Sequence, residues 1–516
     1  MAKICLCLTA KTLQRDLEIL NKYRKYADMA ELRVDCLEPD ERLLIRSFPG
    51  LAGMPVILTI RRDIDGGRFV GGEGARINLM ARGMAYAEAD RRHNFAYLDI
   101  EDDLNVSSLE EAARTFGTRI IRSYHNITGT DADIAARIRS MRRSGDEIVK
   151  VSVTANSTRD VLNLLQAGKK CADQEKILIS MGHYGVYSRI LAEQFGSFLS
   201  YTAAFSETDA PPAAPGQIDV LEMANLYRFR NITKATKVYG IVGNPLKTTG
   251  NPHFFNTVFE LEETNAVYVP FPADSIADFI EIAGELNVEG ISVTFPYKEA
   301  VIPFLDNLSG EVHTIKTCNT LNLTPQGWLG TNTDLKGFSD SLLAFFGKSN
   351  FKRQKVTVIG AGAAARAIVY ELHRLGAKVL ILNRTTHKAR RLAALYKFAW
   401  GSLDDREIER IDKYRDFIIQ ATSVGMEAPD AAVSPVQDPS APKDPLAMYN
   451  FCGREKVMDL IYEPKITTFL KRALNAGCNT QNGYDMLIRQ ARYQYAQFTG
   501  KEFPEHYISK VQLGDN

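Results

Sequence analysis

The chain has 516 residues, more than one hydrophobic core usually holds, which predicts two to four domains. Its 63 basic and 62 acidic side chains leave a formal net charge of +1, which excludes a global positive field that would favour nucleic acid or an anionic membrane. No apolar stretch approaches the roughly 20 residues that cross a bilayer, and "MAKICLCLTA" lacks a basic leader, so we expect a cytoplasmic protein with small-molecule partners and leave its oligomeric state open.

From residue 3 to about 205, short β-rich runs alternate with longer helical stretches. The eight runs are "KICLCLT", "AELRVDCL", "PVILTIR", "FAYLDIE", "TRIIRSYH", "EIVKVSVTA", "KILISMG" and "SFLSYTAAF". Parallel strands need helical crossovers, and eight strands close around a packed interior, so residues 1–225 are predicted to form a (β/α)8 barrel. From the pattern alone, an open doubly wound sheet remains the alternative.

The rest of the chain is predicted to form further α/β domains. Residues 226–236 follow the loop "SETDAPPAAPG" closely and are expected to be a linker. Residues 237–347 again alternate strand and helix. Residues 348–480 carry the runs "VTVIG", "AKVLILNRT", "DFIIQATSVG" and "EKVMDLIYEP", typical of a second parallel sheet. Residues 481–516 are expected to form helices that pack back on the domain of residues 237–347.

The segment "VIGAGAAA" has the pattern of a dinucleotide-binding turn. Gly360 suits the tight turn after a strand, Gly362 allows backbone amides to approach a pyrophosphate, and Ala365 fills the third small position. The next strand ends in "LNRT", which puts Arg384 where an NAD site carries an acidic residue. Because an arginine suits a 2′-phosphate, the pattern favours NADP over NAD.

Three upstream runs end in polar turns: "ISVTFPYK", "KTCNT" and "GTNTDLKG". Lys298 and Asp334 suit the proton transfer that ketone reduction requires beside a hydride donor. Thr294, Asn319 and Asn332 are short hydrogen-bonding residues that suit a polyhydroxylated ligand. The alternative is a surface lysine, an N-cap aspartate and turn asparagines.

These motifs resemble the shikimate dehydrogenase family over residues 237 to about 495. "GNPLKTTGNP", "VTFPYK", "CNT", "GTNTD", "IGAGAAA", "NRT", "ATSVGM", "DLIYEP" and "GYDMLIRQ" occur in the order expected of that family. The resemblance implies reduction of 3-dehydroshikimate by NADPH, with Lys298 and Asp334 as the acid/base pair. It implies substrate contacts from Thr249, Asn251, Thr294, Asn319, Asp334, Tyr462 and Gln490. It implies cofactor contacts from Gly360, Ala361, Gly362, Ala363, Ala364, Asn383, Arg384, Thr385, Lys388, Thr422, Leu460 and Gly483.

The chain departs from that family in two places. Thr249 and Asn251 stand where the family usually carries two serines before the proline of a substrate-binding turn. Ala363 replaces the second member of the glycine pair that ends the family's G-A-G-G loop, a mild change if its φ is negative.

The barrel segment also carries candidate catalytic groups. Lys150 lies in an apolar strand, where burial favours the uncharged amine that attacks a ketone to form a Schiff base. His125 ends the preceding strand and suits proton transfer near neutral pH. Further polar residues fall at the end of the strands where barrel enzymes work: Glu31, Arg33, Arg61, Arg189 and Gln217. The alternative is a lysine reaching solvent, a structural histidine and surface arginines.

This half resembles type I 3-dehydroquinate dehydratases over residues 1 to about 225. The resemblance implies that Lys150 forms an imine with the substrate, that His125 transfers protons, and that Glu31 and Asp65 support His125 and the leaving hydroxyl. Arg33, Arg61, Arg189, Gln217 and the position of Ala213 would contact the substrate. Asp65 is one methylene shorter than the family's usual glutamate, and Ala213 replaces a frequent serine.

The whole chain thus resembles the fused dehydratase and dehydrogenase of the shikimate pathway, with NADP(H) as cofactor and without a metal. A ligand-sensing regulator with inactive sites is one alternative, which intact Lys150, His125, Lys298 and Asp334 oppose. A catabolic, NAD-dependent quinate or shikimate dehydrogenase is the other, which Arg384 opposes.

Overall fold

The computed structural model describes residues 1–85, 88–246, 250–347, 349–426 and 443–511. Contacts divide the chain into two compact units, each considered by itself below. The first consists of Met1–Gly240 and Phe255–Val288, the second of Ile241–Phe254 and Glu289–Asn516. Within the described ranges, no helix is both long and apolar enough to cross a membrane.

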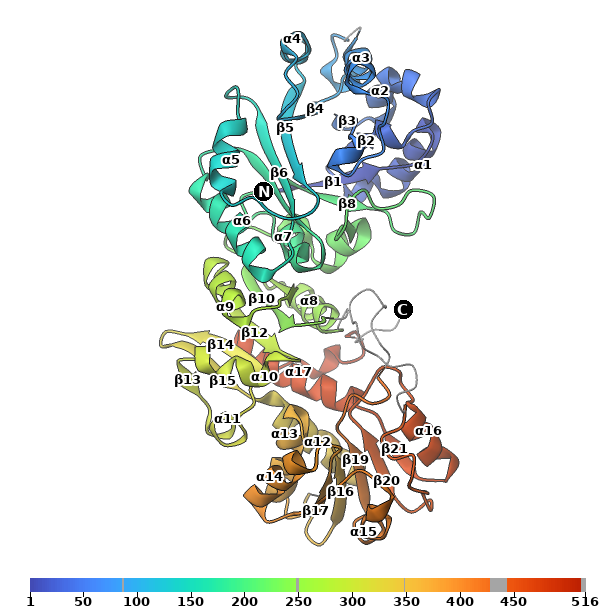
Figure 1. The fold of residues 1–516 in the computed structure, drawn as a ribbon, viewed down its shortest axis with the longest axis vertical. Helices are drawn as coiled ribbons and strands as arrows, with labels where there is room; N and C mark the ends of the chain where they lie inside the picture. The colour runs from blue at the N-terminus through green and yellow to red at the C-terminus, as the bar shows by residue number, and fades with distance from the viewer. Residues whose placement is uncertain (86–87, 247–249, 348, 427–442, 512–516) are drawn as a thin grey trace. The chain divides into compact units, whose positions relative to one another are not determined.

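Eight parallel strands follow one another around a barrel in the first unit (Figure 1). They are β1 (Lys3–Leu8), β2 (Met29–Arg33), β3 (Val56–Thr59), β4 (Tyr97–Glu101), β5 (Arg119–Asn126), β6 (Ile148–Thr154), β7 (Lys176–Met181) and β8 (Leu199–Ala203). Strand β1 pairs with both β2 and β8, and a parallel bridge from Lys176 to Ser197 joins β7 to the segment before β8. The predicted barrel is confirmed, and the open-sheet alternative is wrong.

Helices follow the barrel strands as crossovers. They are α1 (Leu13–Tyr23), α2 (Phe48–Ala52), α3 (Glu73–Met84), α4 (Ser107–Thr115), α5 (Ile134–Met141), α6 (Thr158–Lys170) and α7 (Val186–Ile190). Helix α6 shows why such segments are helical: Ser157 and Asp160 form a capping box, and Val161, Leu164 and Leu165 are buried.

Alternation along the strands builds the barrel interior in layers. An apolar layer consists of Cys5, Met29, Ile57, Tyr97, Ile121, Ile148, Ile177 and Leu199. Side chains two residues further on point to the same side of each strand. That second layer is Cys7, Glu31, Thr59, Asp99, Ser123, Lys150, Ile179 and Tyr201. The layers place polar groups directly above an apolar floor.

A second sheet has the order β11-β10-β12-β14-β15-β13. Its strands are β10 (Lys237–Gly243), β11 (Ala266–Pro272), β12 (Val288–Val293), β13 (Asn307–Leu308), β14 (Thr320–Thr324) and β15 (Gly327–Thr331). The helices in this stretch are α8 (Asn251–Leu261), α9 (Ile276–Glu285), α10 (Tyr297–Ala300), α11 (Gly310–Ile315) and α12 (Thr333–Phe346). Strand β14 runs antiparallel to β12 and β15, so a hairpin interrupts the expected alternation of strand and helix.

The third sheet is parallel, with the order β18-β17-β16-β19-β20-β21. Its strands are β16 (Lys355–Ile359), β17 (Lys378–Leu382), β18 (Ala399–Gly401), β19 (Phe417–Gln420), β20 (Lys456–Asp459) and β21 (Asn479–Gln481). Its helices are α13 (Ala363–Arg374), α14 (Thr386–Tyr396), α15 (Ile408–Lys413) and α16 (Thr468–Asn475), and α17 (Tyr484–Thr499) packs against α12. The order reverses at β16, where doubly wound sheets bind nucleotides, so the predicted Rossmann-type fold is confirmed.

Candidate active sites

One cavity of the first unit brings together every residue that the sequence analysis proposed for the barrel. Its lining includes Glu31, Arg33, Arg61, Asp65, His125, Lys150, Arg189, Ala213 and Gln217. These residues come from strand ends, from the loops that follow them and from α7. They therefore share the end of the barrel at which such enzymes carry their chemistry.

Lys150 is buried in the second layer of the barrel, with 4% of its surface exposed. Its Nζ lies 2.9 Å from Asp99 Oδ2, 3.9 Å from Glu31 Oε1 and 4.5 Å from the centroid of the Tyr201 ring. The amine that the sequence analysis placed in an apolar strand therefore has a direct ion pair with Asp99.

Asp99 is a site residue that the sequence analysis missed. Its Oδ1 accepts a hydrogen bond from Ser123 Oγ at 2.6 Å and lies 2.8 Å from Arg61 Nη2. Burial raises the pKa of a carboxyl group, but Arg61 and Lys150 outweigh burial here, so the pKa of Asp99 lies well below its ordinary value. Its position in the strand could have revealed it, because Asp99 follows inward-facing Tyr97 by two residues and therefore faces the same side.

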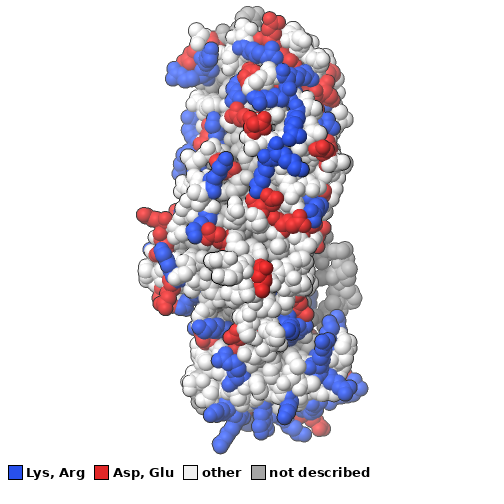
Figure 2. All heavy atoms as spheres, turned by 90° about the vertical axis from the view of Figure 1, so that its left-hand side faces the viewer, with Lys and Arg blue, Asp and Glu red and all other residues white. Residues whose placement is uncertain are grey.

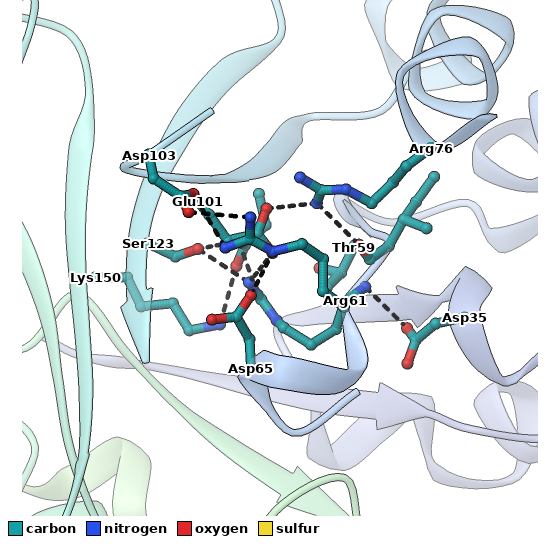
Figure 3. Close-up of polar contacts among 12 residues, drawn as sticks. Asp35, Thr59, Arg61, Asp65, Arg76, Glu101, Asp103, Ser123 and Lys150 are labelled. Carbon is teal, nitrogen blue, oxygen red and sulfur yellow. Dashed lines mark hydrogen bonds and ion pairs between the residues drawn. The ribbon is translucent and has the colours of Figure 1, made fainter. Parts of the chain in front are cut away.

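Arg61 belongs to a buried chain of alternating charges (Figure 3). Its Nη1 donates to Glu101 Oε1 at 2.6 Å and to Ser123 Oγ at 3.1 Å. The other oxygen of Glu101 pairs with Arg76, a fully buried residue of α3. Arg61 is therefore ion-paired within the protein, and a substrate would share it with Asp99 and Glu101.

Two other predicted residues have close partners within the barrel. Arg33 donates from Nε and Nη2 to the two oxygens of Asp35, at 2.9 and 2.8 Å. Glu31 accepts hydrogen bonds from Thr59 Oγ1 at 2.9 Å and from Cys7 Sγ at 3.1 Å. Both side chains are thus held in fixed orientations at the cavity wall.

His125 follows Ser123 by two residues on β5 and lines the same cavity. Its Nδ1 is buried and has no hydrogen-bond partner among the described residues. Burial, and then the positive charges of Arg61 and Lys150, hold the pKa of His125 well below 6.5. The imidazole is therefore neutral at neutral pH and able to accept a proton.

Arg189 is the buried cation of this cavity that has no carboxylate partner in the described part of the chain. It is 2% exposed, and its Nη2 donates to Pro215 O at 3.0 Å, while its buried Nε has no partner. Burial lowers the pKa of Arg189 to about 10. Nearby, Gln217 accepts from the backbone of Ala213 at 2.6 Å. An arginine buried in this way is suited to an incoming anion.

The second unit has its own cavity, lined by most of the residues predicted to contact the substrate and by three of those predicted to contact the cofactor. It includes Asn251, Thr294, Lys298, Asn319, Asp334, Ala364, Leu460, Tyr462, Gly483 and Gln490. The proposed contact at Thr249 lies outside the described residues. Asn251 is buried at the start of α8.

Lys298 and Asp334 form an ion pair in the wall of that cavity. Lys298 Nζ lies 2.5 Å from Asp334 Oδ2, and Asn319 Nδ2 donates to Asp334 Oδ1 at 2.8 Å and to Gln490 Oε1 at 3.0 Å. The N-cap of α12 is Asn332, whose Oδ1 accepts from the backbone of Asp334 at 3.1 Å. Asn332 therefore caps α12, and Asp334 does not have the capping role that was considered for it. Because its side chain caps the helix, Asn332 does not face a ligand.

Two more residues of this cavity were missed. Gln494 lies one helical turn after Gln490 on α17, and its Nε2 donates to Asn319 O at 3.2 Å. Ser292 Oγ donates to Gln494 Oε1 at 2.9 Å. The spacing of four residues on one helix is the signal that could have identified Gln494.

The predicted dinucleotide turn follows β16. Gly360 has a φ of +116°, and a Cβ there would lie 3.0 Å from Ala421 O, so only glycine fits without strain. Gly362 is the N-cap of α13, where a Cβ would meet open space. Ala363 begins α13 and is not among the residues with positive φ, which satisfies the condition set for this substitution.

The turn after β17 carries four of the other predicted cofactor residues, Asn383, Arg384, Thr385 and Lys388, whereas Thr422 follows β19. Asn383 Nδ2 donates to Thr385 O at 2.9 Å. Arg384 and Lys388 are exposed and have no ion pair among the described residues. Basic side chains gather at the lower end of the face drawn in Figure 2, where Figure 1 has β17 and α14. This turn can therefore accept a phosphate without displacing a carboxylate.

Comparisons with known proteins match successive parts of the chain. The family models match as type I 3-dehydroquinase over residues 4–234, shikimate dehydrogenase substrate binding domain over 241–321, and shikimate/quinate 5-dehydrogenase over 343–429. The chloroplastic bifunctional 3-dehydroquinate dehydratase/shikimate dehydrogenase of Arabidopsis thaliana is 30% identical over 511 residues, covering 94% of this chain and 80% of the relative.

Two further proteins are similar to this chain, one over about half of its length and the other over nearly all of it. The shikimate dehydrogenase (NADP(+)) of Caldanaerobacter subterraneus is 37% identical over 293 residues, 55% of this chain and 99% of the relative. A solved dehydroquinate dehydratase and shikimate dehydrogenase from S. pombe is 24% identical and covers 99% of this chain and 98% of its own, with a TM-score of 0.43. On the Arabidopsis match and the successive family models, the chain belongs to the family of bifunctional 3-dehydroquinate dehydratase/shikimate dehydrogenases.

Proposed function

We propose that the barrel dehydrates 3-dehydroquinate to 3-dehydroshikimate and that the second unit reduces this product to shikimate with NADPH. The observation that carries the proposal is that each unit has a cavity built around a paired lysine, with Lys150 at 2.9 Å from Asp99 and Lys298 at 2.5 Å from Asp334. The name of the Arabidopsis relative supports both reactions in one chain.

In the barrel, Lys150 is the nucleophile. Its nitrogen bonds to the carbonyl carbon of the substrate, and the carbonyl oxygen leaves as water. The imine acidifies the neighbouring C–H, and neutral His125 accepts that proton. The adjacent hydroxyl then leaves as water with the proton from His125, and hydrolysis frees the Lys150 amine. Glu31 and Asp65 support His125 and the leaving hydroxyl.

Substrate binding in the barrel relies on buried cations. Arg189, which has no carboxylate partner in the described part of the chain, is suited to the carboxylate of 3-dehydroquinate. Arg61 and Arg33, each already oriented by an acidic residue, contribute the donors that Asp99, Glu101 and Asp35 leave available. Gln217 and the backbone of Ala213 complete the contacts to substrate hydroxyls.

In the second unit, Lys298 delivers a proton to the oxygen of the reduced carbonyl while Asp334 holds the amine. Asn319, Thr294, Tyr462 and Gln490 bind substrate hydroxyls. Asn251, together with Thr249, binds the substrate carboxylate.

The turn after β16 fits a dinucleotide, since Gly360 needs its positive φ and Gly362 leaves room at the N-terminus of α13. Ala361, Ala363, Ala364, Thr422, Leu460 and Gly483 would complete this binding surface. Arg384 and Lys388, with Asn383 and Thr385, would hold the 2′-phosphate that distinguishes NADPH from NADH. When bound, NADPH supplies the hydride. Relatives named as NADP(+) enzymes support this preference.

The test is to mix the purified chain with 3-dehydroquinate and NADPH and follow the absorbance of the reduced cofactor, with identification of shikimate as product. Lys150→Ala is expected to abolish dehydration while added 3-dehydroshikimate is still reduced, and borohydride with substrate is expected to label Lys150. Lys298→Ala is expected to have the converse effect. If either variant, still folded, lost both reactions, two separate sites would be the wrong description.

The relatives do not favour the two alternatives, because their names give the dehydratase and dehydrogenase pair and NADP(+). A ligand-sensing regulator would bind both intermediates without consuming them. A catabolic dehydrogenase would oxidise quinate or shikimate faster with NAD than with NADP.

A further inference from the structure

The loop of residues 61–69 joins β3 towards α3 and carries Asp65 to the wall of the barrel cavity. Its backbone is closed on itself: Phe69 N donates to Arg61 O at 3.1 Å, and Gly67 N donates to Arg62 O at 2.8 Å. Gly67 permits this closure, because a Cβ there would lie 2.2 Å from Arg61 O. The loop backbone is therefore fixed, and the direction of the Asp65 carboxylate depends on its side-chain contacts.

Arg62 supplies the contact that orients Asp65. Arg62 Nε donates to Asp65 Oδ2 at 2.6 Å, and among the described residues no other group forms a hydrogen bond or ion pair with that carboxylate. The side chains of Arg62 and Asp65 are 17% and 12% exposed, so solvent screens this pair only partly.

Asp103 holds the far side of the same guanidinium. It accepts from Arg62 Nη1 and Nη2, each at 3.0 Å, in a bidentate pair from the segment after β4. Because the guanidinium is planar, fixing two of its nitrogens also fixes the direction of Nε. Asp103 and Asp65 are both labelled in Figure 3, and they come from different loops.

We propose that Arg62 is a positioning residue of the dehydratase: anchored by Asp103, it holds one oxygen of Asp65 and thereby presents the other to the cavity that contains His125 and Lys150. The inference rests on the proposed function of the barrel and on the role of Asp65 in it. An aspartate reaches less far than a glutamate, so its carboxylate must be oriented more closely to act in the cavity. The anchored Arg62 provides that orientation.

A double-mutant cycle tests the proposal. Arg62→Ala, Asp65→Asn and the double variant are compared for kcat and KM in dehydration of 3-dehydroquinate, and each sample is also assayed for reduction of added 3-dehydroshikimate. Arg68→Ala is the matched control, because Arg68 is an exposed arginine of the same loop whose side chain has no hydrogen bond or ion pair among the described residues.

We expect Asp65→Asn to lower kcat for dehydration about 100-fold and Arg62→Ala about tenfold, with smaller changes in KM. The double variant is expected to be no slower than Asp65→Asn alone, because Arg62 then has no functional carboxylate to orient. Arg62→Lys is expected to retain an intermediate rate, since an ammonium cannot hold both carboxylates in the same geometry.

Four results would overturn the inference. If Arg62→Ala slows the Asp65→Asn enzyme by the same factor as the wild type, or slows both reactions of the chain, Arg62 acts only on the fold. If Asp65→Asn dehydrates at the wild-type rate, Asp65 needs no positioning, although the proposed function stands. If the unmodified chain does not dehydrate 3-dehydroquinate, the proposed function itself fails.

Discussion

Replacing Arg189 by methionine is expected to stabilise the barrel while weakening its binding of 3-dehydroquinate. Burial lowers the pKa of this guanidinium from 12.5 to about 10. Each pKa unit corresponds to 1.36 kcal/mol, so holding the buried charge costs about 3 kcal/mol at neutral pH. The unfolded chain binds this proton more tightly than the folded chain, so the cost persists at every pH below about 10 and is relieved only above it.

Methionine removes the charge and fills much of the same volume, so the free energy of unfolding should rise by about 2 kcal/mol, the remainder being lost in packing. The carbonyl of Pro215, which loses the hydrogen bond from Arg189, is in an exposed residue and can bind water. KM for 3-dehydroquinate should rise about 100-fold, because the substrate carboxylate loses a buried charged partner.

The assay follows chemical unfolding of the full-length variant by circular dichroism and loss of dehydratase activity, with dehydrogenase activity as the internal control. Arg61→Met is the matched variant, since Arg61 is equally buried but has Asp99 and Glu101 as partners. Asp99 and Glu101 would keep Lys150 and Arg76 as partners but lose the buried cation that they share, which should destabilise the barrel by about 3 kcal/mol. Equal destabilisation by both substitutions would refute the view that Arg189 is a cation without a partner.

Further predictions concern the cofactor turn and the proton acceptor. Arg384→Asp should lower the ratio of kcat/KM for NADPH over NADH at least 100-fold, and an unchanged ratio would exclude Arg384 from the 2′-phosphate site. His125 accepts a proton only above its pKa, which burial and the charges of Arg61 and Lys150 hold below 6.5. The dehydration rate should therefore decrease with falling pH only below pH 6.5. A decrease that begins at or above pH 6.5 would contradict the assignment of His125 as proton acceptor. Gly360→Ala should destabilise the second unit by about 1–3 kcal/mol, whereas Gly362→Ala should not. Thermal unfolding of the two variants shows whether the backbone strain at Gly360 causes the loss, since equal destabilisation would mean that the turn tolerates no added methyl group.

Much of the fold and of the catalytic constellation could be predicted because the relevant signals are local. A strand exposes alternate residues to one side, so the run around Lys150 and the run around His125 predict inward-facing groups without knowledge of neighbouring strands. Eight such runs with crossovers predict closure of the barrel. The same reasoning could have identified Asp99, which follows Tyr97 of the apolar layer by two residues and therefore faces the same side of its strand. The β14–β15 hairpin was not predicted, although Leu321 and Leu323 alternate with polar residues in β14, because the direction in which two strands pair is not contained in the period of either strand.

The sequence by itself determined which chemical groups face the same side of each strand and helix, since side-chain direction follows from their periodicity. Only the tertiary structure decided which of those groups are already paired. Arg61 and Asp99 are 38 positions apart and meet at 2.8 Å across neighbouring strands, while Arg189 finds no carboxylate in the described part of the chain. Such pairing depends on the stagger of the barrel strands and on where loops close, and neither can be read from the period within one strand.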